Sequence, residues 1–181
     1  GSLLLLIILE PDLGTAALLA VIFLLMVFTA GAIISQLLLL LGGNLLLFAY
    51  FIISEGYRWQ RMLAFLHPGA DPKDAGYHII QSLIALGSGG ITGVGLGSSS
   101  QKYFYLPEPG TDFIFSVLGE ELGFVGSFII LLLYALLVLR GIRIAVRAPD
   151  LFGALIAVGI TFWIGFQALI NIGVATGSLP V

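Results

Sequence analysis

The sequence lacks cysteine and is poor in charge. None of its 181 residues is cysteine, which excludes disulfide bonds and thiolate metal sites. Charged residues make up only 9% of the chain, which is too few to cover the surface of a water-soluble protein. Seven Lys and Arg stand against ten Asp and Glu, which gives a net charge of -3. Because a nucleic-acid surface needs a basic stripe, we expect no nucleic-acid partner.

Hydrophobic residues, in contrast, make up 59% of the chain, more than a water-soluble domain of this size could bury. We therefore expect an integral membrane protein in contact with membrane lipids. A helix that crosses the bilayer needs about 20 residues. Four segments qualify, with expected bounds of about 13–34, 36–53, 113–139 and 151–176. The predicted fold class is all-α, a polytopic transmembrane helix bundle in a single membrane domain.

One long polar connection, residues 55–112, separates the second and third expected spans. Within it, residues 75–86 have a helical pattern but are too few to span, which indicates an interfacial or re-entrant helix. The Gly-rich run 87–97 follows. It could form a backbone nest for phosphate or a close-packed loop, although it has no Walker lysine.

The orientation follows from Arg140, Arg143 and Arg147, which precede Asp150 in a short connection. The positive-inside rule places this connection in the cytoplasm. Counting back one span then places the long connection, residues 55–112, outside the cell.

Three acidic residues mark the third expected span. An ionisable side chain in or near a span is costly and indicates a functional site, and Asp112 is the first candidate. Asp112 could also serve only as a helix N-cap. Glu120 and Glu121 follow it by roughly 12 to 13 Å along a helix. At 100° per residue Glu120 lies about 80° from Asp112 and Glu121 about 180°, so Glu120 is the better neighbour for Asp112.

Three further polar residues stand beside or inside apolar segments. Asn44, in the middle of the second expected span, predicts a hydrogen bond between helices. Arg58 and Arg61 are three residues apart and share one helical face. They could reach toward lipid headgroups beside Trp59, or bind a pyrophosphate through their guanidinium groups.

Four stretches of the sequence carry recognisable motifs. They are EPDLGTA (10–16), the run from YRWQRMLAFLHPG to GVGLG (57–97), SQKYFYLPEPGTDFIFSVLGEELGFVG (100–126) and NIGVATGSLPV (171–181). In the same order, these stretches resemble the SEDS family of FtsW, RodA and SpoVE. The resemblance covers nearly the whole chain, and the motifs are more similar to the FtsW and SpoVE branch than to the RodA branch.

The resemblance implies a peptidoglycan glycosyltransferase that polymerises lipid II and works with a class B penicillin-binding protein, for cell division or cell shape. It implies a multi-pass protein of the bacterial cytoplasmic membrane whose active site faces outside. The chain corresponds to the C-terminal part of such a protein. A lipid II flippase and a non-enzymatic scaffold for a transpeptidase are the alternative functions.

The expected site residues follow from charge, spacing and position in the chain, and the resemblance supports Asp112, which matches an Asp of the family. Asp112 is expected to be catalytic. The expected substrate-binding residues are Arg58, Arg61, Lys102 and Glu108, and the expected structural or supporting residues are Glu120, Glu121 and Asn44. No cofactor is required with certainty, and a divalent cation, Mg or Mn, is left open. The chain departs from the family pattern at Gly110, Phe104 and His78, where His, Glu and Gln respectively are found in other members.

Overall fold

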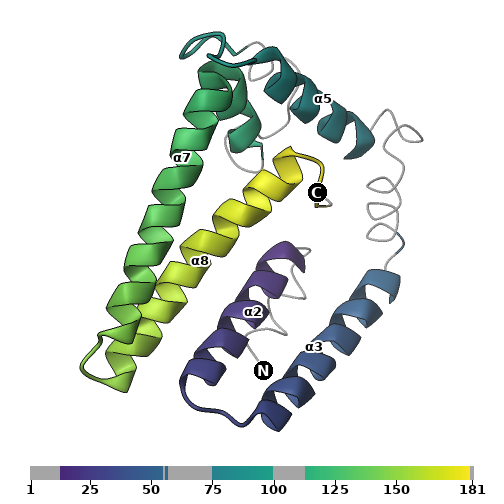
Figure 1. Ribbon diagram of the computed structural model, residues 1–181. Coiled ribbons are helices and arrows are strands. Elements are labelled where there is room, and N and C mark those ends of the chain that lie inside the picture. Colours follow the sequence, from purple (N-terminus) through teal and green to yellow (C-terminus); the bar gives the residue numbers. More distant parts are fainter. Residues whose placement is uncertain (1–12, 55, 57–74, 100–112, 180–181) are drawn as a thin grey trace. The chain divides into compact units, whose positions relative to one another are not determined.

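All regular secondary structure in the described part of the chain is helical. The computed structural model describes residues 13–54, 56, 75–99 and 113–179, and these contain no strand. The expected all-α class is confirmed for these residues. The helices, shown in Figure 1, are α2 (Leu13–Thr29), α3 (Ile34–Ser54), α5 (Ala75–Ser88), α7 (Ile114–Val146) and α8 (Leu151–Ala175).

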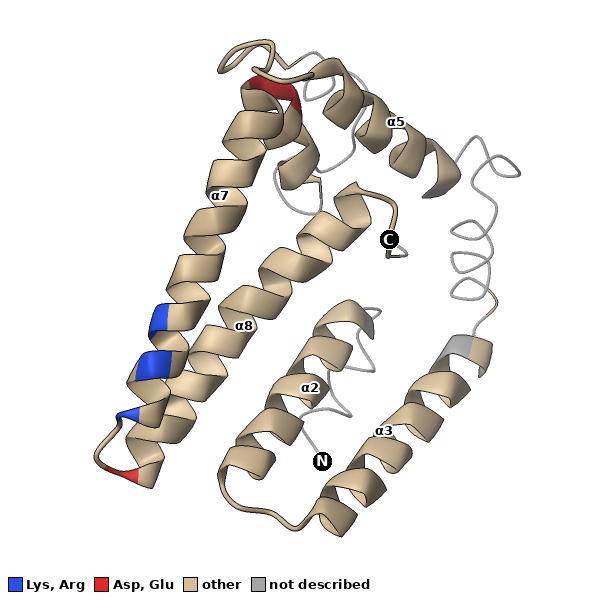
Figure 2. Ribbon diagram, viewed as in Figure 1, with Lys and Arg blue, Asp and Glu red and all other residues tan. Residues whose placement is uncertain are grey.

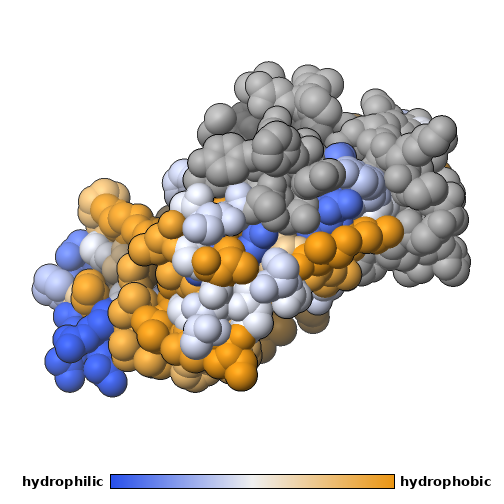
Figure 3. Space-filling view, turned by 90° about the horizontal axis from the view of Figure 1, so that it is seen from above, coloured by the Kyte–Doolittle hydropathy of each residue, from blue (hydrophilic) through white to orange (hydrophobic). Residues whose placement is uncertain are grey.

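Three of these helices are long and apolar enough to cross a membrane. Their qualifying segments are Ile34–Phe51, Ile114–Val146 and Leu151–Ala175. Large apolar side chains lie exposed on them, with Leu39 77% and Leu46 76% exposed, and Figure 3 shows such side chains in orange. Exposing this surface to water would be unfavourable, whereas lipid or further spans can cover it.

Helix α2 ends earlier than the expected span 13–34. Gly31 has a φ of 90°, and the amide of Ala32 donates to the carbonyl of Val27 at 3.2 Å. The amide of Gly31 donates to the carbonyl of Phe28 at 3.0 Å, which completes a Schellman motif. Apolar composition continues through this turn, so hydropathy did not reveal the end of the helix.

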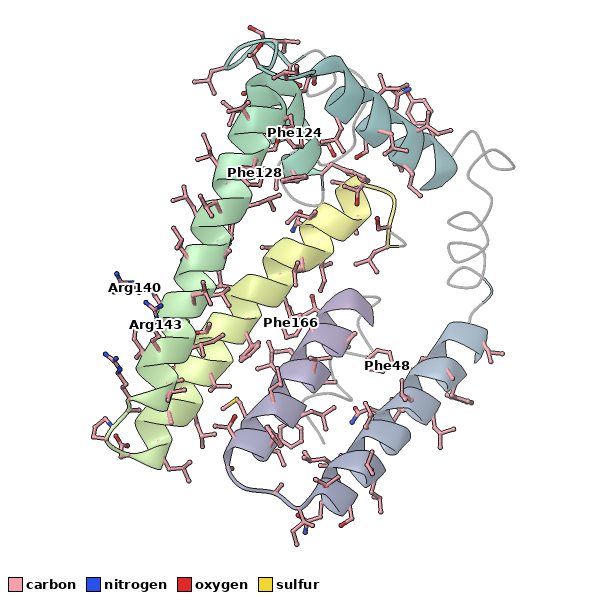
Figure 4. All side chains as sticks on the ribbon, viewed as in Figure 1. Phe48, Phe124, Phe128, Arg140, Arg143 and Phe166 are labelled. Carbon is pink, nitrogen blue, oxygen red and sulfur yellow. The ribbon has the colours of Figure 1, made fainter. Side chains whose placement is uncertain are left out.

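Helix α7 extends beyond the expected end at residue 139, because Arg140 and Arg143 belong to the helix, whereas Arg147 comes directly after it. Figure 4 shows Arg140 and Arg143 pointing away from α7, and both are exposed. Arg143 in the last turn also complements the negative end of the helix dipole. The polar connection that remains before α8 is short, and Asp150 begins α8 by accepting the amide of Gly153 at 3.1 Å.

The chain divides into two compact units. Unit 1 comprises Gly1–Glu55 and Ala135–Gln167, and unit 2 comprises Gly56–Tyr134 and Ala168–Val181. Helices α7 and α8 contribute to both. In unit 1, α2 packs against α3. The amide of Asn44 donates to the carbonyl of Leu40 in its own helix, at 2.7 Å. This differs from the bond between helices that we expected, because a carbonyl one turn back is within reach of a short polar side chain.

Unit 2 positions the candidate site. Its apolar cluster contains Phe113 and Val117 at the start of α7, with Val174 and Ile170 from the end of α8. Helix α5, which begins at residue 75 as expected and ends at Ser88, belongs to the same unit. The loop after α5 lies over the first turns of α7, as Figure 1 shows.

Candidate functional site at the break in α7

Helix α7 is interrupted at Gly123, which has a φ of 68° and a ψ of -168°. This region of backbone conformation is essentially restricted to glycine. In the sequence, Gly119, Gly123 and Gly126 are equally compatible with close helix packing, so the interruption was not predicted. Glu120 and Glu121 lie immediately before it.

The loop after α5 replaces the hydrogen bonds that the break removes. In an unbroken helix, Phe124 and Val125 would donate to the carbonyls of Glu120 and Glu121. Instead, Phe124 donates to the carbonyl of Gly90 at 2.9 Å and Val125 to that of Ile91 at 3.1 Å. In return, the carbonyls of Glu120 and Glu121 accept the amides of Val94 and Gly95, at 3.0 and 3.1 Å. The loop and the helix therefore form one hydrogen-bonded joint.

These bonds help to decide whether the Gly-rich run 87–97 is a phosphate nest or a close-packed loop. A phosphate nest needs amides that point at the anion. The amide of Gly93 donates to Gly89 at 2.8 Å, and the amides of Val94 and Gly95 donate to α7. A Cβ on Gly93 would collide with the backbone of Glu121. The structure therefore favours the close-packed loop at these positions.

Glu120 and Glu121 are buried, at 2% and 8% exposure. The hydroxyl of Ser99 donates to Oε2 of Glu120 at 2.5 Å, and Ser99 is itself 1% exposed. Oε1 of Glu121 has no hydrogen-bond partner in the described residues. Figure 2 shows the two acids in red near the start of α7 and the arginines in blue near its end. The supporting role expected for both glutamates stays a prediction.

The other expected site residues lie outside the described residues. These are Asp112, Arg58, Arg61, Lys102 and Glu108. Two described residues, Ser99 and Phe113, are joined through the chain to the segment 100–112, which carries three of them.

His78 of α5 lies beside Phe113, with ring centroids 6.4 Å apart. Nδ1 of His78 is buried and has no hydrogen-bond partner among the described residues. No group of three possible metal ligands occurs within the described ranges. Binding of Mg or Mn therefore stays a prediction.

Three serines were missed by the sequence reasoning. The hydroxyls of Ser82 and Ser116 are 2.5 Å apart, and Ser82 donates to the carbonyl of Ala175 at 2.6 Å. These bonds join α5, α7 and α8. Ser82 and Ser116 could have been found, since a hydroxyl in an apolar helix indicates a bond between helices. Ser99 lies between two other serines, and nothing in the sequence distinguishes it.

Comparisons with known proteins give a consistent result. The family described as cell cycle protein, comprising FtsW, RodA and SpoVE, matches residues 2–181. The stage V sporulation protein E of Bacillus subtilis (strain 168) is 51% identical over 180 residues, covering 99% of this chain and 49% of that protein. The probable peptidoglycan glycosyltransferase FtsW of Halothiobacillus neapolitanus is 47% identical over 179 residues, covering 97% and 43%.

A chain in the solved structure "Structural coordination of polymerization and crosslinking by a peptidoglycan synthase complex" is similar over 99% of this chain and 49% of its own length. Its TM-score is 0.73 and its sequence identity 32%. The present chain thus spans about half the length of the relatives it matches.

Proposed function

Because this chain belongs to the family of cell cycle proteins that comprises FtsW, RodA and SpoVE, we propose that the full-length protein polymerises lipid II into glycan strands. The match over residues 2–181 carries this proposal. Relatives named as probable peptidoglycan glycosyltransferases support the reaction class. The synthase complex named in the similar structure supports a class B penicillin-binding protein as the partner.

The reaction requires a base and a cationic site. The 4-hydroxyl of the acceptor sugar loses its proton as it bonds to the anomeric carbon of the donor, and a positioned carboxylate can accept that proton. We assign this role to Asp112. The bond from the anomeric carbon to the lipid pyrophosphate breaks, and the leaving group keeps the electron pair. Its negative charge needs cations, and we assign Arg58, Arg61 and Lys102 to it, with Glu108 as a further substrate contact.

The site belongs at the outer face of the bacterial cytoplasmic membrane. From the arginines at the end of α7 we infer that this end is cytoplasmic and that the segment before α7 is outside. Lipid II presents its sugars and pyrophosphate there. Mg or Mn could add positive charge beside the pyrophosphate, and no step above depends on it.

The alternative functions are a lipid II flippase and a scaffold for the transpeptidase. A flippase needs polar side chains along a transmembrane path, whereas α7 has no charged residue between Glu121 and Arg140. Purified full-length protein in detergent, incubated with labelled lipid II, separates these functions. Glycan polymer supports the glycosyltransferase, whereas its absence from correctly folded protein would contradict it.

We expect the isolated 181-residue chain to make no polymer. It spans about half the length of its relatives, so polar faces of its helices would lack the helices that satisfy them. The measurement is the same polymerisation assay, with full-length protein as the positive control. Polymer from the isolated chain at a rate comparable to the control would show that this part is sufficient.

Arg58→Lys and Arg61→Lys are each expected to raise the KM for lipid II about tenfold while protein levels stay normal. Lysine keeps the charge but loses the two-pronged hydrogen bonding of guanidinium, and one charge-assisted bond is worth about 1.5 kcal/mol. Steady-state kinetics of the full-length variants give the answer. Arg140→Lys at the other end of α7 is the control, expected to leave KM unchanged. If none of the three variants changes KM, Arg58 and Arg61 do not bind the pyrophosphate, and contact with lipid headgroups is the remaining interpretation.

A further inference from the structure

Arg143 and Arg147 form a positively charged face at the end of α7. Both are exposed, and they are four residues apart. The amide of Arg147 donates to the carbonyl of Arg143 at 3.2 Å, so the helical hydrogen bonding continues one residue beyond Val146. Side chains four residues apart are neighbours on a helix surface. The two arginines therefore share one face and lie roughly 6 Å apart along the helix.

Helix α8 packs against the opposite face of α7. A Cβ on Gly141 of α7 would collide with the side chain of Thr161 of α8. A Cβ on Gly165 of α8 would lie 3.0 Å from Cγ2 of Val138. Gly141 and Val138 lie about 140° and 160° around the helix from the middle of the arginine face. Figure 4 accordingly shows Arg143 on the side of α7 away from α8. Helix α8 thus leaves the arginine face uncovered.

The positive charge of this face is not balanced within the described residues. Neither guanidinium group has an ion pair or a hydrogen bond there. Asp150 follows closely in the chain, but its carboxyl group accepts the amide of Gly153 at 3.1 Å. The negative end of the α7 dipole supplies only about half a charge. More than one positive charge is therefore left for a ligand.

The same face of α7 is apolar on the side toward the bilayer centre. Leu136 and Leu139 are 50% and 52% exposed. Leu136 lies at the middle of the arginine face, and Leu139 lies about 60° from it. Apolar side chains therefore lead along the helix to a cationic end. A phospholipid has the complementary arrangement, with acyl chains next to a phosphate, whereas a free phosphate ion has no part that would contact the leucines.

We propose that Arg143 and Arg147 bind the phosphate of an anionic phospholipid of the cytoplasmic leaflet, with an acyl chain along Leu136 and Leu139. Each guanidinium group can donate two hydrogen bonds to one phosphate. The headgroup layer on one side of a bilayer is roughly 5 to 7 Å thick, so two residues one helical turn apart fit within it. The site lies at the opposite end of α7 from the proposed reaction, and the inference does not depend on the proposed function.

Lipid binding by the full-length protein tests this proposal. Delipidated protein in detergent is titrated with phosphatidylglycerol, which is anionic, or with phosphatidylcholine, which is zwitterionic, and native mass spectrometry counts the bound lipids. The parent is expected to bind phosphatidylglycerol more tightly. The double variant Arg143→Gln/Arg147→Gln is expected to raise the Kd for phosphatidylglycerol about 10- to 30-fold. Equal Kd values of the parent for the two lipids, or an unchanged Kd in the folded double variant, would contradict the proposal.

Two further variants separate a local site from general attraction by charge. Arg143→Lys/Arg147→Lys keeps both charges, so it is expected to keep the preference for phosphatidylglycerol, although its Kd rises because lysine lacks the planar fork. A loss as complete as in the Gln variant would overturn the assignment. Lys73→Gln removes a positive charge from the connection 55–112 and is expected to leave the Kd unchanged. If Lys73→Gln weakened binding as much as Arg143→Gln, net charge and not this face would attract the lipid.

Inorganic phosphate distinguishes the two sources of a phosphate group. A large excess of it is expected not to displace bound phosphatidylglycerol from the parent, because it gains no contact with Leu136 and Leu139. Displacement would show that the arginines take free phosphate, and the lipid assignment would fail. Binding of phosphatidylcholine and the melting temperature, measured for each variant, show that the variants are folded.

Discussion

Asp112→Asn is expected to lower the rate of lipid II polymerisation by the full-length protein about 10²- to 10⁴-fold, the range that a positioned general base contributes. Asparagine has nearly the size of aspartate but cannot accept the proton of the acceptor hydroxyl. It caps a helix about as well as aspartate, so the start of α7 is expected to persist. The measurement is polymer formed per folded molecule, together with binding to the partner transpeptidase.

The chain contains a matched control for this substitution. Asp150 begins α8 and accepts the amide of Gly153 in the manner of an N-cap. Asp150→Asn makes the same chemical change at a helix start with no assigned role in catalysis, and is expected to polymerise at the parental rate. If folded Asp112→Asn matched Asp150→Asn in rate, Asp112 would be a helix cap and not the base.

The second large effect is expected from Gly123→Ala, which should lower the melting temperature of the full-length protein by roughly 5 °C or more. A residue with a side chain costs about 1 to 3 kcal/mol in the backbone conformation of Gly123. The added Cβ would also collide with the amide of Gly93 and lie 2.7 Å from the carbonyl of Ile91. The loop would have to move away from α7, and the bonds of the joint would weaken.

Gly42→Ala is the matched control. Gly42 lies inside α3, and nothing is within 4 Å of the place that its Cβ would take. Alanine is favoured over glycine within a helix by roughly 0.5 to 1 kcal/mol, so this variant is expected to melt at or slightly above the parental temperature. Equal melting temperatures for Gly123→Ala and Gly42→Ala would mean that the break in α7 does not require glycine.

Apolar runs were sufficient to predict most of the helices, because hydropathy is a local property of the sequence. The same property could not locate helix ends that depend on backbone conformation or on charged residues continuing a helix. Gly31 ends α2 within an apolar stretch, and Arg140 and Arg143 continue α7 beyond one.

For the candidate site, the sequence predicts only the chemistry, and its residues Asp112, Arg58 and Arg61 stay predictions outside the described residues. Asp112 and the arginines follow from charge near a membrane and from the family resemblance. The break at Gly123 and the contact of Ser99 with Glu120 depend on residues far apart in the sequence, which periodicity cannot relate. In the sequence, a glycine at position 123 is compatible both with close helix packing and with a break in the helix. Only its backbone conformation shows that the helix is broken there.

The joint between the Gly-rich loop and α7 constrains the length of the chain more than its composition. Its four bonds connect backbone groups of residues 90–95 to those of 120–125, and most side chains there take no part in them. Exchanging one side chain for another at Val94 or Phe124 leaves every donor and acceptor in place. Inserting or deleting one residue on either side would move later partners out of register, so among related sequences this joint should vary at positions such as Val94 and Phe124 but not in its spacing or at Gly93 and Gly123.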